Sequence, residues 1–252
     1  MKKPHAVQRL FLERLSRSTR PYLARGHQIV RCPQCRLAKL YCQCHLRRDI
    51  PSESAFCLLM YDAEVLKPSN SARLIADLID DTYAFLWSRT NPPEALLSLL
   101  EDPLYQPVVI FPRQNALPDQ PMTSSHQLQQ LDKKPLFILL DGTWREAHKM
   151  YRKSPWLHAF PLLSFDLDEP PSRYSLRKGS LGFQLATAEV AALALDALGE
   201  GKNAKALLCW FEVFCEASLQ VTTKASAIER QPLAILQEAY LQAVDEAIHA
   251  KG

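Results

Sequence analysis

Residues 136–144 are Leu-Phe-Ile-Leu-Leu-Asp-Gly-Thr-Trp, and this stretch decides the fold class. The apolar run of its first five residues is typical of a strand buried on both faces of a sheet. The run ends at Asp141, and a helical pattern follows over 145–153. Open α/β sheets bind ligands where a strand ends in this way. The alternative is that Asp141 or Thr143 caps the helix and Trp144 fills the core, and these residues alone do not decide between the two.

Alternating strand and helix patterns extend on both sides of this stretch. Apolar segments at 56–60, 83–87, 107–111 and 162–165 are further predicted strands, and helical patterns lie at about 70–80, 93–101 and 144–153. The alternation favours an α/β fold with a mainly parallel sheet and helices on both faces. The pattern after residue 183 is helical, at roughly 184–199, 203–219 and 231–250. We expect an N-terminal module over 1–50, an α/β domain over 51–225 and a C-terminal helix over 226–252.

The composition narrows the class of protein. With 252 residues, 47% hydrophobic and 23% charged, the chain can bury the core of a large domain. No apolar run has the length of a membrane span, and the basic N-terminus is not followed by the apolar region of a secretion signal. Seven cysteines without such a signal suggest a cytoplasmic protein with reduced thiols. The seven glycines form no dinucleotide-binding, P-loop or nucleophile-elbow motif.

The first 50 residues are strongly basic. They hold 12 Lys and Arg against 2 acidic residues, so their net charge is +10, and the remaining 18 basic and 25 acidic residues give −7. A helix is expected over 5–20, with one apolar face and with its arginines mostly on other faces. This distribution suggests an arm that binds nucleic acid, although a solvated basic helix without function would look the same.

Four cysteines lie within 13 positions in the pattern C-x2-C, six residues, C-x-C: Cys32, Cys35, Cys42 and Cys44. Four thiolates at this spacing can surround one tetrahedral zinc ion. Because no coordination position stays open, such a zinc would be structural. Disulfides and an iron–sulfur cluster are the alternatives. Nearby basic residues suggest contacts with phosphates, namely Arg31, Arg36, Lys39, Arg47 and Arg48.

Polar residues gather in the segments that follow the predicted strands. Since parallel strands end at the same edge of a sheet, these segments should form one composite pocket. Ser69 or Asn70 is expected to cap the next helix. The candidate residues are Lys67, Ser69, Asn70 and Arg73 after the first strand, Phe111 and Pro112 after the third, residues 140–144 at the end of the fourth, Tyr174 and Arg177 after the fifth, and Leu185, Thr187 and Glu189 at the next helix start.

These motifs resemble the DTW-domain family, whose name comes from the D-x-T-W signature found here at 141–144. The cysteine pattern, the run Lys-Pro-Ser-Asn at 67–70, Phe111-Pro112, Tyr174-x-x-Arg177 and Thr187-x-Glu189 follow the family's order over about residues 30–220. The similarity is greatest to bacterial tRNA-uridine aminocarboxypropyltransferases. It implies transfer of the 3-amino-3-carboxypropyl group of S-adenosylmethionine to N3 of a tRNA uridine, with release of methylthioadenosine. It also implies a SPOUT-like, knotted cofactor site.

The resemblance implies roles for the candidate residues. Asp141 is the expected base, since the proton on uridine N3 has a pKa well above neutrality. The expected RNA contacts are Lys67, Ser69, Asn70 and Arg73. The expected S-adenosylmethionine contacts are Phe111, Pro112, Leu140, Gly142, Thr143, Trp144, Tyr174, Arg177, Leu185, Thr187 and Glu189. Zinc on the four cysteines would be structural, and tRNA is the expected partner. The sequence does not give the oligomeric state, although a monomer is slightly favoured. Two other functions stay open: methyl transfer to RNA, and zinc-dependent RNA binding without catalysis.

Overall fold

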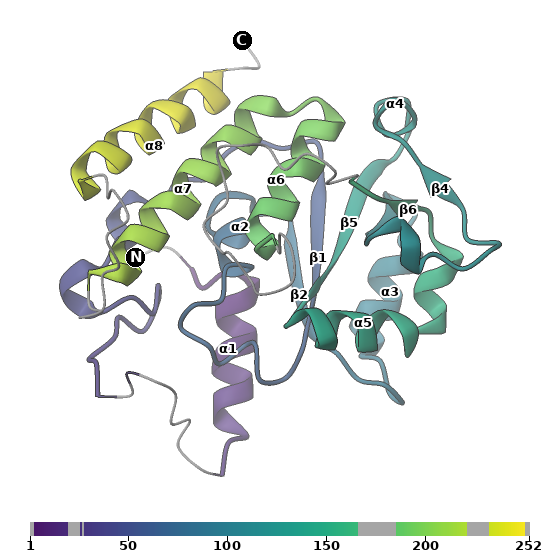
Figure 1. Ribbon diagram of the computed structural model, residues 1–252, viewed down its shortest axis with the longest axis horizontal. Helices are drawn as coiled ribbons and strands as arrows, with labels where there is room; N and C mark the ends of the chain where they lie inside the picture. Colours follow the sequence, from purple (N-terminus) through teal and green to yellow (C-terminus); the bar gives the residue numbers. More distant parts are fainter. Residues whose placement is uncertain (1–2, 20–25, 27, 166–184, 221–231, 250–252) are drawn as a thin grey trace.

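A computed structural model gives the fold of residues 3–19, 26, 28–165, 185–220 and 232–249. In these parts of the chain, six strands form one sheet in the order β2-β1-β5-β3-β6-β4, and every neighbouring pair is parallel (Figure 1). The predicted α/β class is therefore confirmed. The strands are β1 (Ala55–Met60), β2 (Thr82–Leu86), β3 (Tyr105–Ile110), β4 (Met122–Thr123), β5 (Lys134–Asp141) and β6 (Leu162–Leu163).

Helices cover both faces of the sheet, as expected from the alternation. One face packs on α3 (Glu94–Glu101) and α5 (Trp144–Arg152). The other packs on α1 (Ala6–Ser16), α2 (Arg73–Leu78), α6 (Thr187–Leu198) and α7 (Gly201–Leu219). The C-terminal α8 (Leu233–Ile248) lies along α7, and the short α4 (Ser125–Leu128) contacts α6 (Figure 1). Short 3-10 turns lie at Lys39–Tyr41, Cys44–Leu46, Arg113–Asn115 and Pro155–Ala159.

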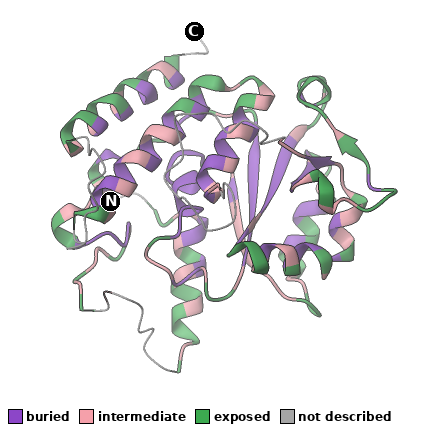
Figure 2. Cartoon of the chain, viewed as in Figure 1, coloured by how far each residue is buried: buried purple, intermediate pink, exposed green. Residues whose placement is uncertain are grey.

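The two central strands show why apolar runs without alternation form this sheet. Every residue of β1 is fully buried (Figure 2). Its side chains belong alternately to the two hydrophobic clusters. The same alternation in β5 places Phe137 and Leu139 toward α6 and Ile138 toward α5. Since side chains two positions apart share a face, Asp141 points to the side of α6. Burying each large side chain contributes roughly 1.5–3 kcal/mol to folding.

Differences from the predicted elements are confined to short segments and ends. The two-residue β4 and the four-residue α4 were not predicted, because such short segments carry no periodic pattern. The first helix ends at Ser16 and not at residue 20, and Leu15 near its end is 43% exposed. The chain path that a knot would require passes through 166–184, which lie outside the described residues, so the knot stays a prediction.

The N-terminal and C-terminal segments share one hydrophobic core with the sheet. Leu37 and Leu46 belong to the same cluster as α7 and α8. The Tyr240 hydroxyl donates to the carbonyl oxygen of Leu46 at 3.2 Å, which joins α8 directly to the cysteine segment. Among the described residues, no helix combines the length and the apolar character that crossing a membrane requires.

Candidate active site

A pocket of about 520 Å³ lies at the carboxyl edge of the sheet, where the sequence predicted it. Among the described residues, five chain segments line it: those following β1, β3 and β6, the β5–α5 junction and the start of α6. Among the predicted residues it includes Ser69, Phe111, Pro112, Leu140, Asp141, Gly142, Thr143, Trp144, Leu185 and Thr187. Among its other lining residues are Glu64, Ser71, Ile110, Gln114 and Phe165. Tyr174 and Arg177 lie outside the described residues.

Among the described residues, Asp141 is the one aspartate in the pocket wall, and it is only 2% exposed. The Thr187 hydroxyl donates to its Oδ1 at 2.6 Å, and the Asn70 amide donates to its Oδ2 at 2.6 Å. Burial raises the pKa of Asp141 to about 6, and the nearby charge of Glu64 raises it, while the two hydrogen bonds lower it. The result is a carboxylate that can release or take up a proton near neutral pH.

Asn70 is held so that its amide group faces Asp141. The backbone N–H of Arg73 lies 3.4 Å from Asn70 Oδ1, and Arg73 Nε donates to the Asn70 carbonyl oxygen at 3.3 Å. Because Oδ1 accepts from α2, the Nδ2 group is left to donate to Asp141. Asn70 thus combines the expected contact with the helix N-terminus and a direct contact with the carboxylate.

Arg73 itself is enclosed rather than presented to the pocket. It is 3% exposed, its guanidinium lies 4.6 Å from the centre of the Phe214 ring, and burial lowers its pKa. This position suits a residue that fixes Asn70 more than one that binds RNA directly. Lys67 stays partly exposed, and its Nζ pairs with Glu64 at the pocket wall.

The D-x-T-W turn both caps a helix and shapes the pocket. Thr143 is the N-cap of α5 and forms a capping box with Glu146, as the helix-cap alternative predicted. A Cβ atom on Gly142 would lie 3.0 Å from the Glu146 Cβ and 3.3 Å from the Tyr61 Cβ, so a larger residue would crowd this turn. Trp144 is 46% exposed and stacks on Phe111 with 5.9 Å between ring centroids, so it does not fill the core.

The start of α6 supplies a further wall of the pocket. The Thr187 hydroxyl donates a hydrogen bond to Asp141, so this side chain contacts the carboxylate directly. Glu189 is 6% exposed, and its Oε2 accepts from the backbone N–H of Ala186 at 2.6 Å. This carboxylate therefore stabilises the N-terminus of α6, which holds Thr187 in place.

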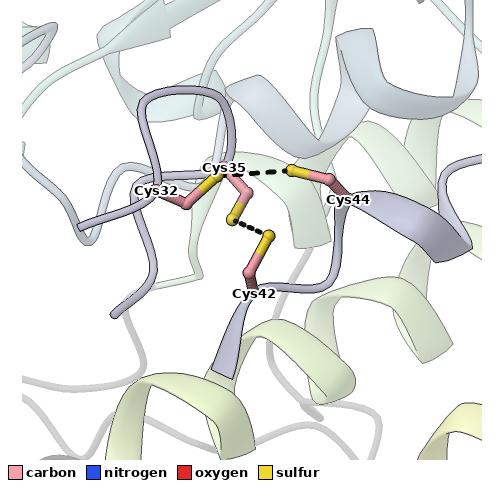
Figure 3. A group of neighbouring side chains, drawn as sticks. All are labelled: Cys32, Cys35, Cys42 and Cys44. Atoms are coloured by element: carbon pink, nitrogen blue, oxygen red, sulfur yellow. Dashed lines mark hydrogen bonds between the residues drawn. The ribbon is translucent and has the colours of Figure 1, made fainter. Parts of the chain in front are cut away.

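The four predicted ligand cysteines converge in one cluster, with the side chains directed toward a common centre (Figure 3). The Cys32 and Cys44 sulfurs are 3.7 Å apart, as are those of Cys35 and Cys42, and all four lie within 4.8 Å of one another. Tetrahedral coordination with Zn–S bonds of about 2.3 Å requires sulfurs about 3.8 Å apart. Disulfides would need about 2.05 Å, so the cluster fits a metal ion and not disulfides.

Two arginines near the cysteines are buried, contrary to the phosphate contacts predicted for them. Arg36 is 9% exposed and donates to the carbonyl oxygens of Val65, at 2.6 Å, and Leu66. Arg47 is 7% exposed, and its Nε lies 2.7 Å from Asp77 Oδ1. Charge alone gave no sign of this burial, because the partners lie about 30 residues away. Lys39 and Arg48 remain exposed.

The buried arginines hold the cysteine segment against the body. Arg36 also lies over the Phe11 ring of α1 at 4.0 Å, and Asp77 further contacts His5 and accepts a 3.1 Å hydrogen bond from Trp210. On α1, Arg14 pairs with Asp62 and Arg17 with Glu13. Several basic side chains of the first 50 residues are therefore paired or buried within the protein.

Fold and site together define an α/β protein with a ligand pocket at the carboxyl edge of a parallel sheet, around a buried carboxylate, and with a four-cysteine cluster that could hold a metal ion. The sequence model of the DTW domain matches residues 29–219, and the chain belongs to the DTW-domain family. The DTW domain is associated with tRNA-modifying enzymes, which suggests an RNA substrate. No solved structure matches the chain.

Proposed function

We propose that this protein transfers the 3-amino-3-carboxypropyl group of S-adenosylmethionine to N3 of a tRNA uridine. The observation that carries the proposal is Asp141, a carboxylate 2% exposed whose pKa is raised to about 6 in the wall of a ligand-sized pocket. A volume of about 520 Å³ lies within the roughly 300–1,000 Å³ of small-molecule sites. Membership of the DTW-domain family supports the RNA substrate.

Asp141 acts as the base in this proposal. With a pKa of about 6 it is roughly nine-tenths ionised at pH 7, and it is still basic enough to accept a proton. Thr187 and Asn70 occupy one lone pair on each oxygen and leave others free for the proton of uridine N3. The nitrogen then bonds to the carbon next to the sulfonium, and the carbon–sulfur bond breaks with its electron pair staying on sulfur.

The pocket walls suit the two substrates. When bound, S-adenosylmethionine supplies the electrophilic carbon and the leaving group. Apolar side chains such as Phe111, Leu139 and Val190 offer a surface for an adenine ring, and backbone groups near Phe111, Leu140 and Leu185 would bind its edge. The exposed Trp144 ring would stack on the target base, and Lys67 and Ser69 would contact the RNA. Tyr174 and Arg177 are proposed for the cofactor through the family motif alone.

Zinc is the metal we propose for the cysteine cluster, with Cys32, Cys35, Cys42 and Cys44 as its ligands. Four thiolates leave no position for a substrate, so the ion would stabilise the fold of the N-terminal module. Arg36, which lies between the cysteines, donates to the loop after β1, and Tyr240 of α8 donates to Leu46 just after them, so these contacts connect the module to that loop and to α8.

Two forms of labelled S-adenosylmethionine test the transfer. Purified protein is incubated with tRNA and the co-substrate labelled either in the carboxyl group or in the methyl group. The proposal predicts label on tRNA from the carboxyl form only, and none with Asp141→Asn. Label from the methyl form alone would show a methyltransferase. Label from neither, with tRNA binding intact, would favour an RNA-binding protein without catalysis.

A further inference from the structure

Helix α5 carries two side-chain ridges beside the pocket. Trp144, His148 and Tyr151 lie at i, i+4 and i+7 and face Phe111, whose ring stacks on Tyr151 with 4.5 Å between centroids. One residue further along, Arg145, Lys149 and Arg152 have the same spacing. A step of one residue turns the helix by about 100°, so the second ridge points away from the buried face. All three of these residues are exposed.

The charges of this basic ridge are available to an outside partner. Neither Arg145 nor Arg152 forms an ion pair or hydrogen bond with any residue that the structure describes. The acidic residue of the helix, Glu146, is engaged in the capping box with Thr143. Residues 144–153 contain four basic residues and this one acid, a net charge of +3. By contrast, Arg14, Arg36 and Arg47 of the basic N-terminal segment are neutralised or buried.

Aromatic side chains flank the ridge on both sides. Phe111 and the exposed Trp144 lie toward the pocket. On the other side Tyr61 stacks on Trp87, and Lys149 Nζ lies 5.5 Å and 5.7 Å from the two ring centroids and 3.2 Å from the Tyr61 hydroxyl. Tyr61 follows β1 and Trp87 follows β2, so this pair also lies at the carboxyl edge of the sheet. Trp144 is exposed and Tyr61 and Trp87 are partly exposed, and positive charge beside accessible rings is typical of surfaces that bind single-stranded nucleic acid.

We infer that the outer face of α5 binds the phosphate backbone of the RNA and directs the target base over Trp144 into the pocket. The ridge from Arg145 to Arg152 is about 10 Å long at 1.5 Å per residue. This inference rests on the proposed RNA substrate and moves its main docking surface from the N-terminal arm to α5. One helix connects RNA binding with placement of the target base, because Trp144 and Ala147 line the pocket while Arg145 and Lys149 are exposed to solvent.

The test compares two variants that each lose two exposed positive charges. Arg145→Gln/Arg152→Gln removes the free arginines of α5, and Lys39→Gln/Arg48→Gln removes two exposed charges near the cysteines. Affinity for an unmodified tRNA transcript is measured from 0.05 to 0.3 M salt, on the order of physiological ionic strength. At roughly 0.7–0.9 per phosphate contact, the α5 variant should lower the slope of log K against log salt by about 1.5 and weaken binding on the order of tenfold. The control should keep an affinity close to wild type, and the α5 variant should keep the wild-type unfolding temperature. Arg48 also donates to the carbonyl oxygens of His45 and Arg47, so the unfolding temperature of the control is measured beside its affinity.

Three outcomes would overturn the inference. Wild-type affinity and salt slope in the α5 variant would exclude this face alone and leave the proposed transfer intact. An equal loss in both variants would mean that binding follows net charge and not the surface of α5. Absence of tRNA binding by the wild-type protein would remove both the docking surface and the proposed function.

Discussion

Replacement of Asp141 by Asn should stabilise the protein while abolishing turnover. The raised pKa means that ionised Asp141 costs folding energy. The introduced amide has nearly the same shape, and it can accept from the Asn70 amide and donate to the Thr187 hydroxyl, so both hydrogen bonds survive. The substitution therefore removes a buried charge without leaving a polar group unpaired.

The magnitude follows from the pKa. A rise from 3.8 to about 6 corresponds to about 3 kcal/mol, at 1.36 kcal/mol per pH unit. The folded protein holds the Asp141 proton more tightly than the unfolded chain does, so protonation of Asp141 stabilises the fold. This contribution to stability is complete below pH 3.8 and is lost as the pH rises through about 6. At pH 8, Asp141→Asn should therefore be more stable by up to about 3 kcal/mol, or about 6 °C in unfolding temperature for a chain of this length.

Asp77 offers a matched control, because it is equally buried at 2% exposure but has charged partners. Burial would raise its pKa, but His5, Arg47 and Arg73 outweigh that effect and lower it to about 2. Its ionised form thus stabilises the fold above pH 3.8, and the stabilisation is lost as the pH falls through about 2. Asp77→Asn should destabilise the protein at pH 8 by roughly 3–5 kcal/mol, since Arg47 would stay buried without its counter-charge.

Thermal unfolding of the three proteins from pH 4 to pH 8 checks this reasoning. The advantage of Asp141→Asn over wild type should be absent near pH 4 and should grow with pH. An Asp141→Asn variant that is less stable than wild type at pH 8, or one whose advantage does not change with pH, would refute the assignment of a buried, energetically costly carboxylate.

Three further predictions concern the groups around this carboxylate and the cysteine cluster. The transfer rate should fall below pH about 6 as Asp141 takes up its proton. The hydrogen bond from the Thr187 hydroxyl lowers the pKa of Asp141, so Thr187→Val should move this decline to higher pH and Thr187→Ser should return it to the wild-type position. A pH profile that does not move in Thr187→Val would contradict the base role. Metal analysis should find one zinc per chain, with Cys35→Ser losing the metal and unfolding at lower temperature; full stability without metal would contradict the structural site. Arg36→Lys keeps the charge but loses the pair of hydrogen bonds to the carbonyl oxygens of Val65 and Leu66. Hydrogen exchange of the backbone amides in residues 61–72 should therefore accelerate about tenfold, and kcat should fall. Unchanged exchange would show that Arg36 does not hold the loop after β1.

The fold was predictable because its central strands are buried on both faces. An apolar run such as 136–140 predicts by itself a strand that is buried on both faces. Parallel strands then bring the loops that follow them to one edge of the sheet. The cysteine cluster was predictable for the same reason, since its ligands lie within 13 positions. The two-residue β4 forms only because β6 provides hydrogen-bond partners, and no local pattern announces that.

Contacts between distant parts of the chain could not be predicted. Asp141 meets Asn70 across 71 positions and Thr187 across 46, and its pKa depends on both. Arg36 and Arg47 have the same composition signal as the exposed Arg48, but folding encloses them against Leu66 and Asp77. The sequence therefore predicted chain segments that line the pocket, whereas the fold determines which side chains face it and which charges stay exposed.

Nucleoside mass spectrometry of tRNA tests the central claim most directly. Total tRNA is taken from cells with the gene, from cells without it, and from deleted cells that express wild-type protein or Asp141→Asn. The proposed function predicts a uridine carrying the 3-amino-3-carboxypropyl group that disappears with the gene, returns with the wild-type protein and does not return with the variant. An unchanged level of that nucleoside in deleted cells, or the loss of a methylated nucleoside in its place, would contradict it.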